Sequence, residues 1–135
     1  ADYSRLCDAI EKGKAITGVD LDATINATPA VMRRTVSMLQ QCARIELLDL
    51  QSCNVRDEDV AILAPVLASS SLLTLHLGNN LLTNASTAPL EAAQKARPQL
   101  RINLKGNKKM VTSDDVARWH APIEALPPGA PVFVE

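Results

Sequence analysis

The architecture of this chain can be inferred from one segment, Ser71-Leu72-Leu73-Thr74-Leu75-His76-Leu77-Gly78-Asn79-Asn80-Leu81-Leu82. Its spaced residues form the pattern L-x-x-L-x-L-x-x-N-x-L: Leu72, Leu75, Leu77, Asn80 and Leu82. This spacing puts Leu75 and Leu77 on one face of a short strand, with an Asn at the strand's end and a Leu under the following turn. One such segment cannot bury its own apolar face, so a stable fold requires the pattern to recur at a fixed period.

The pattern does recur. A step of 27 residues backwards gives residues suited to the same positions: Ile45, Leu48, Leu50, Cys53 and Val55. A step of 27 forwards keeps the strand and the Asn, while the flanking positions become polar: Gln99, Ile102, Leu104, Asn107 and Lys109. A weaker copy lies 29 residues before the second: Ile16, Val19, Leu21, Thr24 and Asn26. The coincidence of these series indicates a repeat array.

With these residues the chain resembles the leucine-rich repeats over residues 16–110. The alternation of 27-residue and 29-residue units, with Cys53 or Asn80 in the turn, is similar to the ribonuclease-inhibitor subclass. That subclass is similar across ribonuclease inhibitor, the GTPase-activating protein for Ran and the actin-capping tropomodulins. A short array that ends in a helix looks most like tropomodulin.

The repeats predict an α/β fold, a short leucine-rich-repeat solenoid with about four parallel strands, outer helices and helical caps at both ends. We expect residues 1–126 to form the repeat domain. A cap helix at residues 3–12 would cover its N-terminal end, and a second at residues 113–126 its C-terminal end. Residues 127–135 would form an extended tail rich in Pro and apolar side chains.

Local signals place the helices and strands. The strands that flank the central segment are expected at 17–22, 46–50 and 101–104. Thr28-Pro29 should start a helix that runs through Gln41, because a hydroxyl cap followed by Pro favours a helix start. Ser86 should cap a later helix that ends at Arg97. Pro65 should kink or shorten the helix between them, because Pro removes one helical hydrogen bond.

The composition suits one compact domain. The chain has 135 residues, of which 47% are hydrophobic, and its single Trp, Tyr and Phe leave an aliphatic core. A net charge of −1 gives no argument for binding nucleic acid or an anionic membrane, so neither is expected as a partner. No apolar run approaches the ~18 residues that a membrane span needs.

The residues that could carry chemistry do not form a recognisable active site. Cys7, Cys42 and Cys53 are odd in number and follow no apolar leader, which favours free thiols in a reducing, cytoplasmic compartment. No Ser-His-Asp or Cys-His motif accompanies His76 or His120, and the cysteines lack metal-ligand spacing. We therefore expect no enzyme activity, no metal and no cofactor.

The positions between the core leucines should form rows on a concave face of the sheet, called here the strand face, because parallel strands place equivalent residues side by side. The middle row reads Asp20, Asp49, His76 and Asn103. The row before it reads Gly18, Leu47, Thr74 and Arg101, and the row after it reads Asp22, Gln51, Gly78 and Lys105. The strand face thus changes from acidic in the first copy to basic in the last.

Ten residues are the candidates for partner contact: Asp20, Asp22, Asp49, Gln51, Thr74, His76, Arg101, Asn103, Lys105 and, in the tail, Phe133. The alternative is that strand positions facing solvent are polar without any partner. The sequence predicts a protein–protein interaction module, an adaptor or scaffold subunit that binds through the strand face, the C-terminal helix or the tail.

Two further functions stay open. One is an architectural subunit of a large assembly such as a cytoskeletal complex, in which the apolar residues 132–134 would be buried against a neighbour. The other is a GTPase regulator of the Ran-activating type, which the resemblance implies. The resemblance also implies actin or another cytoskeletal protein as a possible partner.

Overall fold

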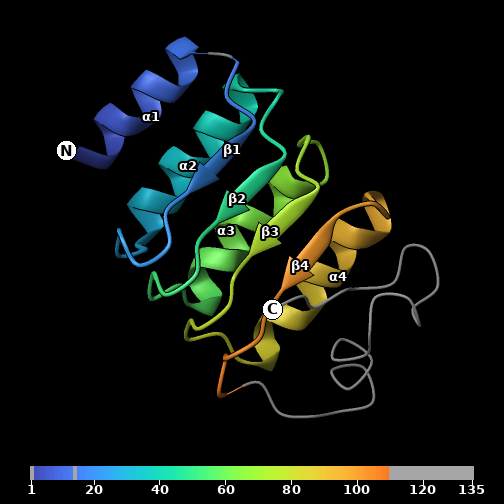
Figure 1. Cartoon of the computed structure of the whole chain (residues 1–135). Helices are drawn as coiled ribbons and strands as arrows, with labels where there is room; N and C mark the ends of the chain where they lie inside the picture. Colours follow the sequence, from blue (N-terminus) through green and yellow to red (C-terminus); the bar gives the residue numbers. More distant parts are fainter. Residues whose placement is uncertain (1, 14, 110–135) are drawn as a thin grey trace.

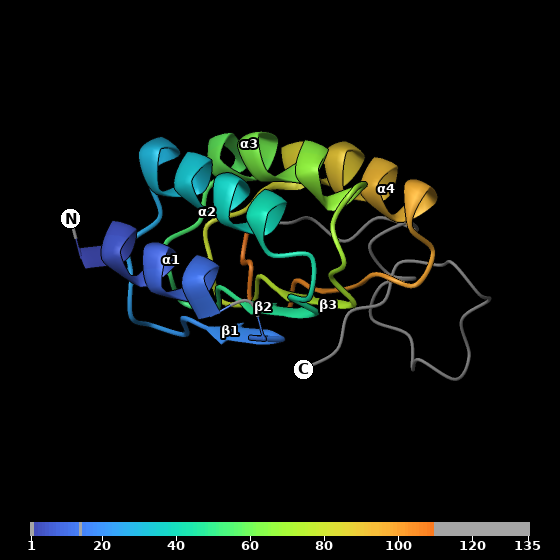
Figure 2. The ribbon, with the colours of Figure 1, turned by 90° about the horizontal axis from the view of Figure 1, so that it is seen from above.

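The computed structural model describes residues 2–13 and 15–109, in which short strands alternate with helices. The elements are α1 (Asp2–Gly13), β1 (Gly18–Asp20), α2 (Pro29–Gln41), β2 (Leu47–Asp49), α3 (Asp57–Leu67), β3 (Thr74–His76), the 3-10 helix η1 (Asn84–Ser86), α4 (Thr87–Ala96) and β4 (Arg101–Asn103). The strands form one sheet in the order β1-β2-β3-β4, and every neighbouring pair is parallel (Figure 1). Figure 2 shows the strands in one layer and helices α2 to α4 in another.

The predicted α/β repeat fold with four parallel strands is therefore confirmed. The helix expected at residues 3–12 is present as α1, which packs against α2. The expected cap helix at 113–126 and the tail at 127–135 lie outside the described residues.

The register of the sheet matches the sequence period. Leu48 of β2 pairs with Val19 and Leu75, and Leu75 pairs in turn with Ile102. The backbone ladder continues beyond the strands, since the Leu50 N–H donates to the His76 carbonyl at 2.9 Å. One sequence repeat is therefore one step across the sheet.

An aliphatic core fills the space between the sheet and the helices. The inward positions predicted from the pattern are all buried: Leu48, Leu50, Leu75 and Leu77 at 0% exposure, Ile102 at 2% and Leu104 at 5%. Their burial supplies the main driving force for stacking the repeats, at roughly 25 cal/mol per Å² of apolar surface removed from water.

Asn80 fixes the turn that follows β3 and ties it to the preceding repeat. Its Nδ2 donates to three carbonyl oxygens, those of Leu50 at 2.9 Å, Leu77 at 2.9 Å and Gly78 at 3.2 Å. Its Oδ1 accepts two backbone N–H groups, those of Cys53 at 3.0 Å and Val55 at 2.9 Å. The Asn of the repeat pattern thus satisfies buried backbone groups that the turn removes from the ladder.

The same turn position is used in the other copies, by an amide at Asn107 and by different donors at Cys53 and Thr24. Asn107 Nδ2 donates to the Leu77 and Leu104 carbonyls. The Cys53 thiol lies 3.1 Å from the Leu21 carbonyl oxygen, and the Thr24 hydroxyl donates to that same oxygen at 2.8 Å. The shared task, a donor aimed at the preceding carbonyls, explains why Cys and Thr can replace Asn.

The residue before each of these positions has a positive φ. The four are Ala23 at 57°, Ser52 at 56°, Asn79 at 53° and Gly106 at 88°. A side chain at Gly106 would place its Cβ 2.1 Å from Asn79 Oδ1, so that position also requires glycine for space. The left-handed residue is a property of the repeat, because each strand must turn sharply toward the helix layer.

Of the two helix caps predicted from the sequence, the structure confirms one and contradicts the other. The Thr28 hydroxyl accepts the Val31 N–H at 3.1 Å and caps α2, as predicted. The prediction for Ser86 is wrong, because its side chain makes no cap bond to α4 and donates to Asp57 Oδ1 at 2.6 Å. Helix α3 continues two residues beyond Pro65 and ends at Leu67.

Asp57 links the start of α3 to the next repeat. Its carboxylate accepts the Thr83 N–H at 3.0 Å, the Thr83 hydroxyl at 2.5 Å and the Ser86 hydroxyl at 2.6 Å. Burial raises the pKa of Asp57, but the hydrogen bonds from Ser86 and Thr83 outweigh it and leave that pKa below its usual value. The charged form is therefore favoured in the folded state.

We expect Asp57 to make stability sensitive to acid. A carboxyl with a lowered folded-state pKa contributes stability above its unfolded pKa of about 3.9, and loses it as the pH falls through the folded value. Asp57→Asn should be less stable at pH 7, because its amide nitrogen cannot accept a hydroxyl, and should lose less stability below pH ~4. Urea denaturation from pH 7 downwards measures both slopes, with Glu58→Gln as the neighbouring control. Parallel slopes for Asp57→Asn and the parent would contradict the assignment.

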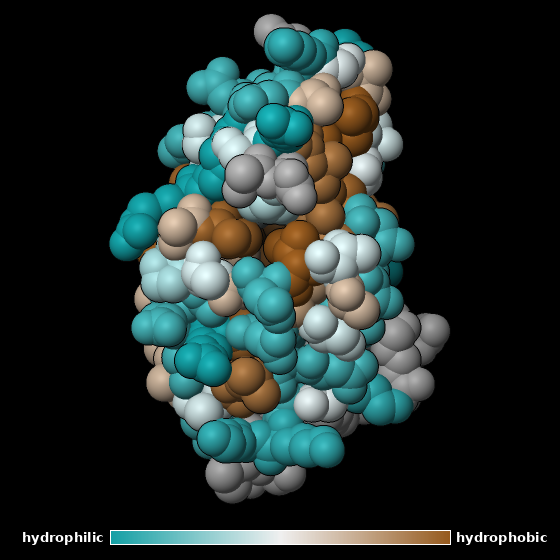
Figure 3. Space-filling model, turned by 90° about the vertical axis from the view of Figure 1, so that its left-hand side faces the viewer, coloured by the Kyte–Doolittle hydropathy of each residue, from teal (hydrophilic) through white to brown (hydrophobic). Residues whose placement is uncertain are grey.

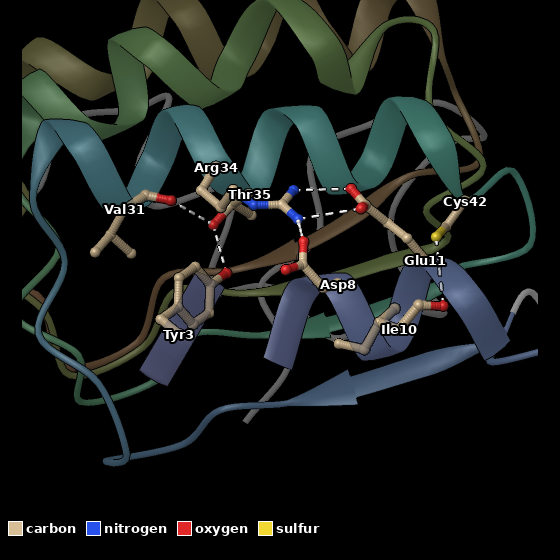
Figure 4. Close-up of polar contacts among 8 residues, drawn as sticks. All are labelled: Tyr3, Asp8, Ile10, Glu11, Val31, Arg34, Thr35 and Cys42. Atoms are coloured by element: carbon tan, nitrogen blue, oxygen red, sulfur yellow. Dashed lines mark hydrogen bonds and ion pairs between the residues drawn. The ribbon is translucent and has the colours of Figure 1, made fainter. Parts of the chain in front are cut away.

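Polar contacts hold α1 against α2 (Figure 4). Arg34 of α2 reaches Glu11 at 2.8 Å and Asp8 at 2.6 Å, and the Tyr3 and Thr35 hydroxyls are 2.6 Å apart. The hydrogen bond from Arg34 lowers the pKa of Glu11. These contacts join the N-terminal cap helix α1 to α2, the helix of the first copy. We therefore interpret them as structural.

The N-terminal end of the stack is only partly polar. Figure 3 faces the end that carries α1 and β1, and shows hydrophobic residues in patches within a mostly hydrophilic surface. Leu6 of α1 is 40% exposed, whereas Cys7 and Ile10 on the same helix are buried. The apolar side of α1 therefore lies mainly against the repeats.

Candidate partner-binding face

The sheet brings the predicted rows together. Asp20 pairs with Asp49, Asp49 with His76, and His76 with Asn103. The row that contains Thr74 and Arg101 follows the same register. The last row is aligned by backbone bonds from Ala23 to Gln51, from Ser52 to Gly78 and from Asn79 to Lys105. Nine of the ten candidate residues therefore share the strand face, and Phe133 lies outside the described residues.

The charged side chains of the first and last copies are the most accessible. Asp20, Asp22, Arg101 and Lys105 are exposed. The middle of the face is half-buried: Asp49, Gln51, Thr74 and His76. Asn103 departs from the expectation of a solvent-facing side chain, because it is only 3% exposed and its Nδ2 lies 3.4 Å from His76 Nδ1.

Three members of the middle row also stabilise their own turns. Each side-chain oxygen accepts the N–H two residues later: Asp20 from Asp22 at 3.0 Å, Asp49 from Gln51 at 2.9 Å and Asn103 from Lys105 at 3.0 Å. This role was missed in the sequence, although the recurrence of Asp or Asn at one repeat position was the available signal. Substitution of Asp20 and Asp49 by Asn should therefore remove the negative charge without disturbing the turns, because Asn retains the oxygen that accepts the N–H.

Gly78, in the row with Gln51 and Lys105, allows the third copy to pack closely against both neighbouring copies. A Cβ at Gly78 would lie 2.9 Å from the Lys105 carbonyl oxygen and 3.3 Å from Gln51 Oε1. A side chain there would push the strands or Gln51 aside. Close packing at this point of the strand face therefore requires glycine.

Basic residues continue past β4 into the turn. Lys108 and Lys109 line a hollow of about 400 Å³, together with Asn79, Leu81 and Gly106. Leu81 is 43% exposed. This edge of the molecule offers cations beside an apolar side chain, adjacent to the row that ends in Lys105.

Comparison with solved structures places the fold. The C-terminal domain of tropomodulin from Caenorhabditis elegans superposes with a TM-score of 0.72 at 16% identity, covering 86% of this chain and 71% of that chain. The fold is similar to tropomodulin's. A leiomodin-1 structure described as its actin-binding site 2 gives a TM-score of 0.68 at 14% identity, covering 82% of this chain and 66% of the leiomodin chain, just under two thirds.

The tropomodulin-like resemblance is thus confirmed for the fold, and the ribonuclease-inhibitor subclass stays a prediction. A scan against protein-family models finds no match, and neither does a search of curated protein sequences.

Residues 2–13 and 15–109 contain no metal-binding cluster and no reactive cysteine. No group of three or more His, Cys, Asp or Glu side chains in these ranges could hold a metal ion. The thiols of Cys7, Cys42 and Cys53 are buried, and burial raises the pKa of Cys7 and Cys53, which disfavours the reactive thiolate. No helix in this part of the chain is long and apolar enough to cross a membrane.

Proposed function

We propose that this chain is a protein-binding module of a cytoskeletal adaptor or scaffold, and that its strand face contacts the partner. The supporting observation is the fold similarity to leiomodin-1 actin-binding site 2, which covers 82% of this chain. Actin is therefore the first partner to test. The strand face is the surface of choice because its exposed side chains are charged, and the one sheet presents those of the first and last repeats on the same face.

No observation on the described residues favours the other two functions over this one. The architectural alternative depends on residues 127–135, and the Ran-type alternative rests on the sequence resemblance alone. We therefore propose the protein-binding module alone.

Co-sedimentation with actin filaments tests the proposal directly. We expect the full chain to enter the pellet in a saturable manner and to lose binding as salt is raised, because exposed charges are screened. A second assay with monomeric actin, by size-exclusion chromatography, covers binding to the unpolymerised form. Absence of complex in both assays would reject actin as the partner.

Charge reversal on the strand face should weaken partner binding. We expect Asp20→Lys combined with Asp49→Lys to reduce affinity about tenfold, because each exposed ion pair contributes up to about 1 kcal/mol and reversal adds repulsion. The circular dichroism spectrum should remain that of a folded α/β domain, although Lys loses the oxygens that accept the Asp22 and Gln51 N–H groups. The matched control is Glu58→Lys with Glu91→Lys, which makes the same charge change on α3 and α4. Equal affinity for both double variants would remove the strand face from the interface.

A further inference from the structure

We propose that the strand face recognises a partner segment in one orientation, with basic residues of the segment over β1 and β2 and acidic residues over β4. This inference rests on the proposed function, since it specifies the partner chemistry for the same face. It follows from the placement of opposite charges at the two ends of the sheet, from the strip without carboxylate or ammonium groups between them and from the basic hollow beside β4.

The acidic side chains Asp20 and Asp49 and the basic side chain Arg101 lie on different strands of the face. Neighbouring strands lie about 4.8 Å apart, so equivalent positions on β1 and β4 are about 14 Å apart and those on β2 and β4 about 10 Å apart. Asp20, Asp49 and Arg101 make no ion pair with any residue in 2–13 or 15–109. The charges of these three side chains are thus left to solvent or to a partner.

The strip between them carries no formal carboxylate or ammonium charge. Over β3 the three rows present Thr74, His76 and Gly78. Gly78 is buried under its neighbours, and the other two are half-buried. A segment that crosses the sheet therefore meets negative charge, then a shallow polar strip, then positive charge.

The hollow beside β4 strengthens the basic end. Lys108 and Lys109 line it without an ion pair to any described carboxylate, and Leu81 adds an exposed apolar surface. An acidic residue next to an apolar one would satisfy both features. A basic segment would be repelled by the same lysines. The acidic end of the partner segment should therefore lie over β4.

The spacing defines the partner segment further. An extended chain rises about 3.3 Å per residue, so about four residues separate groups that lie 14 Å apart. A suitable probe is the peptide Lys-Lys-Ser-Thr-Ser-Glu-Glu with blocked ends. Its matched isomer, Lys-Glu-Ser-Thr-Ser-Glu-Lys, has the same composition and net charge but mixes the signs at each end.

Amide chemical shifts of the 15N-labelled full chain, titrated with each peptide, test the inference. We expect the segregated peptide to bind at least about fivefold more tightly than the mixed isomer, because only it opposes both charged ends. A spin label on its Lys end should broaden the amides of β1 and β2 more than those of β4, and a label on its Glu end should do the reverse. Equal affinities, absence of shifts on the strand face or the opposite broadening would overturn the inference.

Variants connect the effect to named side chains. Asp20→Asn with Asp49→Asn keeps the oxygens that accept the turn N–H groups, and should weaken the segregated peptide roughly threefold to tenfold. Glu58→Gln with Glu91→Gln removes the same charge from α3 and α4 and should leave affinity unchanged. The two proposals fail separately: actin binding with no peptide discrimination refutes only the orientation, whereas discrimination without actin binding refutes only the choice of actin.

Discussion

We expect Leu75→Asp to unfold the domain at 25 °C. Leu75 is fully buried in the central part of the sheet, between Leu48 and Ile102 on the neighbouring strands. Removing a buried Leu costs about 2–5 kcal/mol, and burying an unpaired polar group adds several more. A domain of this size has a total stability of about 5–15 kcal/mol, so the loss is comparable to the whole. Far-ultraviolet circular dichroism and urea denaturation measure the effect.

The matched control is two residues earlier in the same strand segment. Leu73 is 41% exposed, so Leu73→Asp should change the free energy of unfolding by no more than about 0.5 kcal/mol. A Leu75→Asp protein with the parent's urea midpoint would show that this residue is not in the core, and would refute the repeat stack.

The period of the sequence was sufficient to predict the sheet. Parallel strands in a repeat place equivalent residues side by side, so the 27-residue interval between Leu48 and Leu75 fixes their pairing without further information. The same argument placed Asp49 beside His76 on the strand face. Composition and spacing were therefore enough to predict the strand order, the core residues and the order of charges across the strand face.

Contacts between repeats were harder to predict. Ser86 has the sequence of a helix cap, but Asp57 of the preceding repeat offers a charged acceptor and takes its hydroxyl. Ala23 and Ser52 have positive φ although neither residue type favours it, and only their alignment with Gly106 indicates the conformation. The pattern of exposed positions likewise does not reveal that Asn103 is buried and that its side chain contacts His76 of the preceding repeat. At Ser86 a partner one repeat away overrides the local preference, and at Ala23 and Ser52 the sharp turn after the strand does.

Loss of Asn80 is the second large effect that we expect. Asn80→Ala leaves two buried backbone N–H groups and three carbonyl groups without their side-chain partner. Each buried polar group left unsatisfied costs about 1–3 kcal/mol, and some of the carbonyls keep other partners, so we expect a loss of about 4 kcal/mol. Urea denaturation at pH 7 measures it. Asn26→Ala, at an exposed turn with one side-chain bond, should cost less than about 1 kcal/mol.

The variant Asn80→Asp separates the two halves of this network. Its carboxylate can still accept the Cys53 and Val55 N–H groups, but it sets an oxygen against the three carbonyl oxygens that the amide nitrogen contacts. We expect Asn80→Asp to be strongly destabilised at pH 7 and to recover part of the deficit, relative to the parent, as the pH is lowered, because a protonated carboxyl can donate to one carbonyl. A deficit that is constant with pH would mean that the amide nitrogen's bonds contribute little. The stability of the turn would then rest on the two accepted N–H groups, and Asn80→Asp would approach the parent while Asn80→Ala would not.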